Sequence, residues 1–287
     1  PNFKCFGYYG GMPKLNLKNP EVEKYITDVA CYWIKECDID GWRLDVGDEI
    51  SHFFWKNFRK AVKAVKKDML IIGEIWHYAG DFLEGDEWDT VMNYPFYLNL
   101  IDLLADEKIT VSQFVQNLGY LKGRLHKNCY PLMWNLIDSH DTARFLHLCN
   151  DNKKKQHLAA AFQLLLPGMP MIYYGDEYAM PGANDPDCRR GMYWDEEYQD
   201  KEMYEWYKRL IQVRKSHACI VEGELAGSVT EDEEGTIVLI RKNGEETIAM
   251  IFNCSSSAKK FNEYTQKYNL LTENTFDGNV EGVDAAV

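Results

Sequence analysis

The chain has 287 residues, enough to bury a full core and to hold one large domain with a smaller one. Its formal net charge of −13 argues against nucleic acid and against an anionic membrane as partners. No signal peptide or transmembrane run is visible, because the longest apolar stretch, 158–174, is short and is broken by proline and glycine. The first residue is proline, so we expect that a targeting segment upstream could be absent from this sequence.

Eight cysteines are scattered along the chain without a CxxC pair. Several lie in apolar or helical contexts, which favours reduced thiols and a cytoplasmic location, although an even count permits disulfides. We predict no metal site in the chain, because His147-Leu148-Cys149 is too isolated to form a ligand set.

The first helix in chain order is predicted to begin at Asn19-Pro20-Glu21, a capping residue followed by proline at the first helical position and an acid. Apolar residues recur at helical spacing up to about Cys37. Residues 38–41 then break the helix and lead into a strand at 41–46. A second amphipathic helix over 54–65 follows this strand.

Strands and helices continue to alternate through the middle of the chain. Further strands are predicted at 69–75, 89–93, 132–137 and 171–174, and the helices include 153–166 and 202–215. This alternation predicts a parallel sheet with crossover helices. It gives about five strands, whereas a closed (β/α)8 barrel needs eight. An open sheet with its ligand at a topological switch point and the back half of a barrel both fit this pattern.

The pattern changes after His217 to short alternating strands at 236–241 and 247–253. Asn-Gly within 242–245 is a hairpin signal. We therefore predict a barrel portion over 1–217 and a small antiparallel β domain over 218–287.

Two acids stand at the ends of neighbouring predicted strands. Asp45 closes the strand at 41–46, and Glu74 closes the strand at 69–75. Catalytic residues of α/β barrels lie at the C-terminal ends of several strands. Retaining glycoside hydrolysis needs two carboxyl groups roughly 5–5.5 Å apart, one as nucleophile and one as proton donor. Acids on adjacent parallel strands can meet that requirement.

Two further groups lie near these strand ends in the sequence. Arg43, two residues before Asp45, points to the same face of the strand and either forms a structural ion pair or keeps Asp45 ionised. Ser139-His140-Asp141 follows a later strand and adds a third acid, although a His-Asp pair by itself is usually structural.

The joint pattern is more specific than its parts. Gly-Trp-Arg-Leu-Asp (41–45), Gly-Glu-Ile-Trp-His (73–77) and Ser-His-Asp-Thr (139–142) occur in this order, each at a strand end. They closely resemble three signature regions of the α-amylase superfamily of glycoside hydrolases. Met-Pro-Lys-Leu-Asn (12–16) resembles a fourth signature, typical of the branch that holds neopullulanases, cyclomaltodextrinases and maltogenic amylases.

Segments 168–177 and 185–190 resemble that branch's region around the last barrel strand. The resemblance implies an α/β fold made of the C-terminal part of a (β/α)8 TIM barrel, strands 4 to 8, followed by a small antiparallel β-sandwich domain. The family's first signature is absent and would lie upstream. No cofactor is expected within this chain, since a calcium ion, if bound, would be held by upstream residues. We expect the partner that completes the barrel to be the missing N-terminal half or a homodimer partner.

The resemblance also implies roles for the acids. Asp45 would be the nucleophile, and Glu74 would protonate the leaving oxygen and later activate water, which requires a carboxyl protonated near neutral pH. Asp141 would stabilise the transition state through the sugar hydroxyls, with His140 donating to the same ring. Arg43 would orient Asp45. One departure lies beside the nucleophile, where Gly47-Asp48 replaces the usual small residue and asparagine.

Outer contacts to substrate are implied for four further residues. Trp76, with His77 beside it, matches a position that stacks on sugar in the acceptor subsites, and the alternative is a packed rim aromatic. Asp185 and Arg189 would hydrogen-bond the donor sugars, and a structural loop pair is the alternative.

The resemblance implies a retaining hydrolase that cleaves α-1,4-glucosidic bonds in cyclodextrins, malto-oligosaccharides or pullulan, with transglycosylation. The alternatives are an α-glucan transferase or branching enzyme, and a non-catalytic amylase-like subunit or inactive fragment. Asp45, Glu74 and Asp141 are all present, whereas non-catalytic relatives normally lose one or more of the three.

Overall fold

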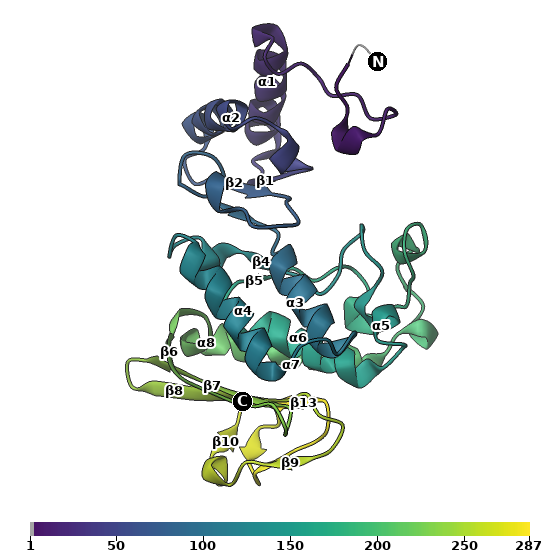
Figure 1. Cartoon of the computed structure of the whole chain (residues 1–287), viewed down its shortest axis with the longest axis vertical. Coiled ribbons are helices and arrows are strands. Elements are labelled where there is room, and N and C mark those ends of the chain that lie inside the picture. Colours follow the sequence, from purple (N-terminus) through teal and green to yellow (C-terminus); the bar gives the residue numbers. More distant parts are fainter. Residues whose placement is uncertain (1–2) are drawn as a thin grey trace. The chain divides into compact units, whose positions relative to one another are not determined.

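The computed structural model describes residues 3–287, and the chain forms two compact units. The first unit holds the chain up to Met92 together with Gly123–Met133, and the second holds Asn93–Lys122 and Trp134–Val287. Figure 1 labels the helices and strands of each unit along the chain. No helix within residues 3–287 combines the length and the apolar character that crossing a membrane requires.

A three-stranded parallel sheet, in the order β1-β2-β3, forms the centre of the first unit. Its strands are β1 (Gly41–Leu44), β2 (Leu70–Gly73) and β3 (Thr90–Val91). Helix α1 (Pro20–Cys37) precedes β1, and helix α2 (His52–Val65) is the crossover from β1 to β2. The predicted strands at 41–46, 69–75 and 89–93 are confirmed, each somewhat shorter than predicted. Short 3-10 helices complete the unit: η1 (Phe6–Tyr8), η2 (Gly47–Glu49), η3 (Gly80–Phe82) and η4 (Tyr130–Leu132).

The start of α1 follows the predicted capping pattern. Asn19 Oδ1 accepts the Glu21 N–H at 2.9 Å, and Pro20 is the first helical residue. In α2, Phe54, Trp55, Phe58 and Val62 are buried at helical spacing and form the apolar face of the helix.

The second unit begins with a helical layer around a second pair of parallel strands, β4 (Trp134–Asn135) and β5 (Met169–Pro170). The helices are α3 (Tyr94–Leu104), α4 (Val111–Arg124), α5 (Phe145–Leu148), α6 (Lys153–Leu165), α7 (Lys201–Ser216) and α8 (Ala218–Glu222), with 3-10 turns η5 (Asp176–Tyr178), η6 (Asp187–Arg189) and η7 (Glu196–Tyr198). The predicted strand at 132–137 and the predicted helices at 153–166 and 202–215 are confirmed.

The strand predicted at 171–174 is wrong, because β5 lies at Met169–Pro170. Met171 N–H makes the last contact with the neighbouring strand, donating to Asn135 O at 2.8 Å. The Met171 carbonyl instead accepts the Gln163 side chain at 2.7 Å, so a buried amide replaces the continuing ladder.

An antiparallel sheet in the order β13-β8-β7-β6 closes the second unit. Its strands are β6 (Glu224–Glu231), β7 (Thr236–Asn243), β8 (Glu246–Asn253) and β13 (Asp284–Ala286). The hairpin predicted within 242–245 is confirmed, with Asn243 opposite Glu246 and Gly244 at φ 59°. Shorter elements lie between β8 and β13: β9 (Lys259–Lys260), η8 (Asn262–Tyr264), β10 (Tyr268–Asn269), β11 (Asn274–Thr275) and β12 (Asn279–Val280).

The helices and this sheet share one core (Figure 1). Phe162 of α6 stacks on Phe252 of β8, with 4.2 Å between ring centroids and 13° between ring planes. Met203, Tyr207 and Leu210 of α7 are buried in the same core. The predicted domain boundary between residues 217 and 218 stays a prediction.

Candidate active site

The register of the parallel sheet brings Asp45 and Glu74 to neighbouring strand ends. Leu44 of β1 lies opposite Gly73 of β2, so the next residue of each strand is one of the two acids. The Glu74 N–H donates to Leu44 O at 2.9 Å, and the Gly47 N–H donates to Glu74 O at 3.1 Å. These backbone bonds hold the two strand ends side by side, so both acids lie at the C-terminal end of the sheet, where α/β folds carry their catalytic side chains.

Arg43 links the two carboxylates. Its Nη1 pairs with Asp45 Oδ1, and its Nη2 lies 3.1 Å from Glu74 Oε2. The contact with Asp45 was predicted from the spacing of two along the strand. The contact with Glu74 was not, because it crosses between strands. One guanidinium therefore compensates two carboxylates.

The two acids differ sharply in exposure. The side chain of Glu74 is 5% exposed and that of Asp45 is 70% exposed. Glu74 Oε2 accepts the Val46 N–H at 2.8 Å, and Oε1 accepts the Trp76 indole N–H at 3.2 Å. Glu74 is thus fixed by several donors, whereas Asp45 faces solvent with Arg43 as its described partner.

The turn after Asp45 has an unusual backbone. Val46 has φ 45° and ψ 45°, a left-handed conformation that a β-branched residue rarely adopts. Such backbone strain is of order 1–3 kcal/mol and is found mainly at functional sites. Here it aims the Val46 N–H at the Glu74 carboxylate.

Trp88 packs beneath both strand ends, and the sequence interpretation missed it. A Cβ on Gly73 would lie 2.2 Å from the Trp88 ring, and a Cβ on Gly47 would lie 2.6 Å from it. Trp88 is buried and stacks on Phe82 with 4.1 Å between ring centroids. The signal that could have found this contact is the glycine beside each acid, since both leave room for a large ring.

Trp76 and His77 lie in the same unit as the acid pair. Trp76 is partly exposed, and its indole N–H donates to Glu74 Oε1. His77 Nε2 lies 3.2 Å from Asp48 Oδ2 and its Nδ1 lies 3.2 Å from Tyr78 O. Their substrate-binding roles stay predictions.

The other four predicted site residues lie in the second unit: His140, Asp141, Asp185 and Arg189. His140 Nε2 lies 3.2 Å from Asp141 Oδ2, and Arg189 Nη2 lies 3.2 Å from Asp141 Oδ1. Arg189 Nε lies 2.9 Å from Asp185 Oδ1 and also 2.9 Å from His140 O. Arg189 thus connects the loop 185–190 to the loop that carries Asp141.

The loop of Asp141 is held by its own short side chains. The Ser139 N–H donates to Thr142 Oγ1 at 2.9 Å, and the Asp141 N–H donates to Ser139 Oγ at 3.2 Å. Tyr94 OH lies 3.1 Å from the same Ser139 oxygen. His140 and Asp141 remain partly exposed at the tip of this loop.

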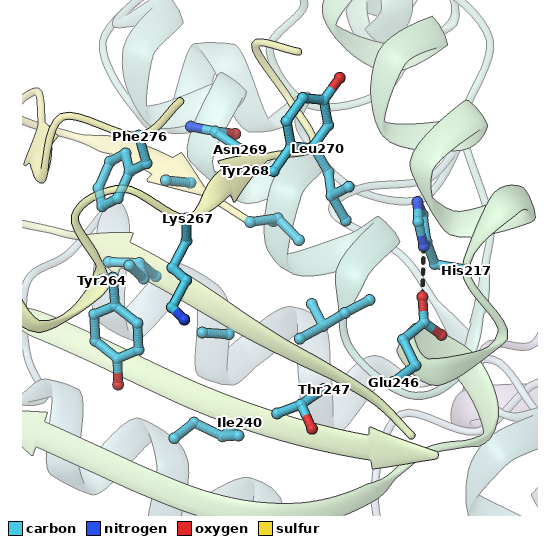
Figure 2. Close-up of a pocket in the computed structure, with 15 residues that line it drawn as sticks. His217, Ile240, Glu246, Thr247, Tyr264, Lys267, Tyr268, Asn269, Leu270 and Phe276 are labelled. Atoms are coloured by element: carbon cyan, nitrogen blue, oxygen red, sulfur yellow. Dashed lines mark hydrogen bonds and ion pairs between the residues drawn. The ribbon is translucent and has the colours of Figure 1, made fainter. Parts of the chain in front are cut away.

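A cavity of about 460 Å³ lies elsewhere in the second unit, on the C-terminal sheet. Figure 2 shows the His217–Glu246 ion pair at one side and Tyr264 and Lys267 at another, around an aliphatic floor. None of the predicted site residues lines it. Within residues 3–287, no three His, Cys, Asp or Glu side chains gather in a way that could hold a metal ion. All eight cysteines are free thiols in this part of the chain.

The alpha-amylase catalytic domain family matches residues 3–223. A cyclomaltodextrinase from Geobacillus thermopakistaniensis (strain MAS1) is 46% identical over 258 residues, 90% of this chain and 44% of that protein. An intracellular maltogenic amylase from Bacillus subtilis is 43% identical over 253 residues, 88% of this chain and 43% of that protein. The solved structure of a cyclomaltodextrinase is similar with a TM-score of 0.94 and 35% identity, over 100% of this chain and 52% of that one.

The chain belongs to the alpha-amylase family of glycoside hydrolases and has the α/β fold of that family. It spans about half the length of the relatives that it matches. The resemblance predicted from the strand-end motifs is confirmed.

Proposed function

We propose that this chain carries the catalytic carboxylates of a retaining glycoside hydrolase. Its substrates would be α-1,4-linked glucans: cyclodextrins, malto-oligosaccharides or pullulan. The observation that carries the proposal is the pair Asp45 and Glu74 at adjacent strand ends, joined by Arg43 and unequal in exposure. The relatives named cyclomaltodextrinase and maltogenic amylase support this substrate class.

In the proposed mechanism, Asp45 attacks the anomeric carbon while Glu74 gives a proton to the departing glycosidic oxygen. The C–O bond breaks and a covalent bond from the sugar to Asp45 forms. Glu74 then takes a proton from water, whose oxygen displaces Asp45. A sugar hydroxyl that replaces water at this step gives transglycosylation. Because Asp45 is exposed, its carboxylate can reach the anomeric carbon. Because Glu74 is held by several donors, it can protonate the glycosidic oxygen from a fixed position.

Asp141 is proposed as the third acid, contacting sugar hydroxyls as positive charge develops, with His140 donating to the same ring. Trp76 and His77 are proposed for the acceptor side of the substrate. Asp185 and Arg189 form an ion pair at 2.9 Å, and we propose that it contacts the donor sugars.

We further propose that residues 1–217 form strands 4 to 8 of a (β/α)8 barrel and that 218–287 form a β-sandwich. Among the described residues, β1 pairs only with β2, which leaves one sheet edge for another strand. On α1, exposed apolar residues recur at helical spacing: Tyr25, Val29, Tyr32 and Trp33. A preceding N-terminal half would cover both, and a homodimer partner is the alternative. We propose a cytoplasmic enzyme that takes no cofactor through this chain.

The test is release of reducing sugar from β-cyclodextrin by the purified chain, with Asp45→Asn and Glu74→Gln as matched inactive variants. The anomer of the first product, followed by NMR, reports retention. Activity from the chain, or from the chain mixed with a separately expressed N-terminal half, that disappears in both variants supports the proposal. If neither the chain alone nor the mixture is active, the non-catalytic alternative is favoured. Transfer of sugar without hydrolysis favours a transferase.

A further inference from the structure

A closed group of ionisable side chains lies beneath the loop that carries Asp141. Asp138 and Asp176 are each 1% exposed, and Arg144 is 0% exposed. Arg144 Nη1 lies 3.1 Å from Asp176 Oδ1, and Asp138 Oδ2 accepts the Phe145 N–H at 2.7 Å. These residues bracket the loop: Asp138 precedes Ser139, and Arg144 follows two residues after Thr142.

The charges of this group do not balance if both acids are ionised. Two carboxylates would then face one guanidinium in a dry interior, and an uncompensated buried charge is costly. Arg144 itself is closed off from further anions by the rings of Tyr173 and Tyr174, at 4.5 and 4.9 Å from its guanidinium carbon. The other titratable groups around the pair add negative charge or none: Tyr97, Tyr207 and Glu177.

Two carboxyl oxygens in the group have no donor. They are Asp138 Oδ1 and Asp176 Oδ2, one on each acid. The two carboxyl groups lie within hydrogen-bonding reach of each other, so one proton between them satisfies both oxygens and balances Arg144. Burial raises the pKa of Asp138 to about 6, and burial together with the neighbouring Asp138 carboxylate raises the pKa of Asp176 well above its usual range.

We propose that Asp138 and Asp176 share one proton at neutral pH and, with Arg144, act as positioning residues that hold the 139–142 loop and so place His140 and Asp141 for the reaction. Asp176 holds the proton and donates it to Asp138, whose other oxygen fastens the Phe145 N–H at the far end of the loop. The two exposed side chains at the loop tip are thereby fixed from below. The kinetic part of this inference rests on the proposed function.

The shared proton is tested by the folding equilibrium between pH 4 and 8. A raised folded-state pKa contributes stability below the unfolded value that is lost as pH rises through the folded value. The shared proton is carried by Asp176, whose folded-state pKa is raised well above its usual 3.8, so the folding equilibrium constant should fall more steeply with rising pH in the wild type than in Asp176→Asn. The exposed Asp195→Asn should keep the wild-type fall. If the stability of Asp176→Asn changes with pH in parallel with that of the wild type, the shared proton is overturned.

Positioning is tested by exchange of the Phe145 amide and by kcat and KM on β-cyclodextrin. Asp138→Ala removes the acceptor, so amide exchange should rise about tenfold and kcat should fall more than KM rises. Asp138→Asn keeps an acceptor oxygen and should restore most of both. Equal exchange and kcat in wild type and Asp138→Ala, or equal losses in the Ala and Asn variants, would overturn positioning. If no protein hydrolyses the substrate, the proposed function fails, and the exchange data still decide this inference.

Discussion

Gly73→Ala tests how tightly Trp88 packs beneath the two acids. A Cβ on Gly73 would lie 2.2 Å from Cε3 and 2.4 Å from Cζ3 of Trp88, whereas carbon atoms in contact are about 3.5–4.0 Å apart. The indole is 1% exposed and stacked on Phe82, so it has no free space to enter. The end of β2 has to move instead, by on the order of 1 Å, and Glu74 is the next residue.

Overpacking of this kind costs about 1–3 kcal/mol, and we expect the upper end because the contact is with a fixed ring. Urea unfolding of the purified chain measures the free energy of unfolding. Gly119→Ala in α4 is the matched control, since a Cβ there meets nothing within 4 Å and alanine should stabilise the helix by about 0.5–1 kcal/mol. The kcat on β-cyclodextrin should fall only in Gly73→Ala.

A double-mutant cycle with Trp88→Leu isolates the contact. Leucine makes room for the new methyl group, so Gly73→Ala should cost little in that background, which gives a coupling energy of about 1–3 kcal/mol. The packing argument is refuted if Gly73→Ala stays within about 0.5 kcal/mol of wild type, or if its cost is unchanged beside Trp88→Leu.

Three further predictions concern single side chains. Val46→Asn should raise the free energy of unfolding by about 1 kcal/mol, because asparagine tolerates the left-handed backbone; a loss of stability in urea would contradict this. Arg43→Gln should lower it by about 1–3 kcal/mol and reduce kcat on β-cyclodextrin, because Glu74 loses its cation; unchanged values would show that the pair is compensated elsewhere. Burial, beside the Trp206 ring at 5.3 Å, lowers the pKa of His157, so the free energy of unfolding should fall as pH drops below about 6.5. Unfolding measured against pH should show that fall weakened in His157→Gln, and an unchanged fall would refute the assignment.

The acid pair could be predicted because local rules determine it. Each acid ends a short apolar strand, and consecutive strands of a parallel sheet pair side by side, so Asp45 and Glu74 follow as neighbours. Strand β6 escaped prediction for the opposite reason: most of its residues are exposed, so no apolar alternation marks it.

Contacts that depend on three-dimensional packing could not be predicted from the sequence. Three contacts depend on how the chain folds back. They are the contact of Arg43 with Glu74, the packing of the Trp88 ring against two glycines, and the contact of Asp138 with Asp176, which lie 38 positions apart (176 − 138). Residue type alone gave no sign of Asp138, which stands one position before a recognised motif.

The stacking of Phe162 on Phe252 bears on how such enzymes can be recombined. A chimera that exchanges residues 218–287 with a relative would receive one ring of that pair from each parent, and the two halves of the core would no longer be matched. A crossover placed ahead of Lys153 would carry α6, α7 and the sheet together and leave the interface intact. The C-terminal strands are in this sense inherited together with the helices that they cover.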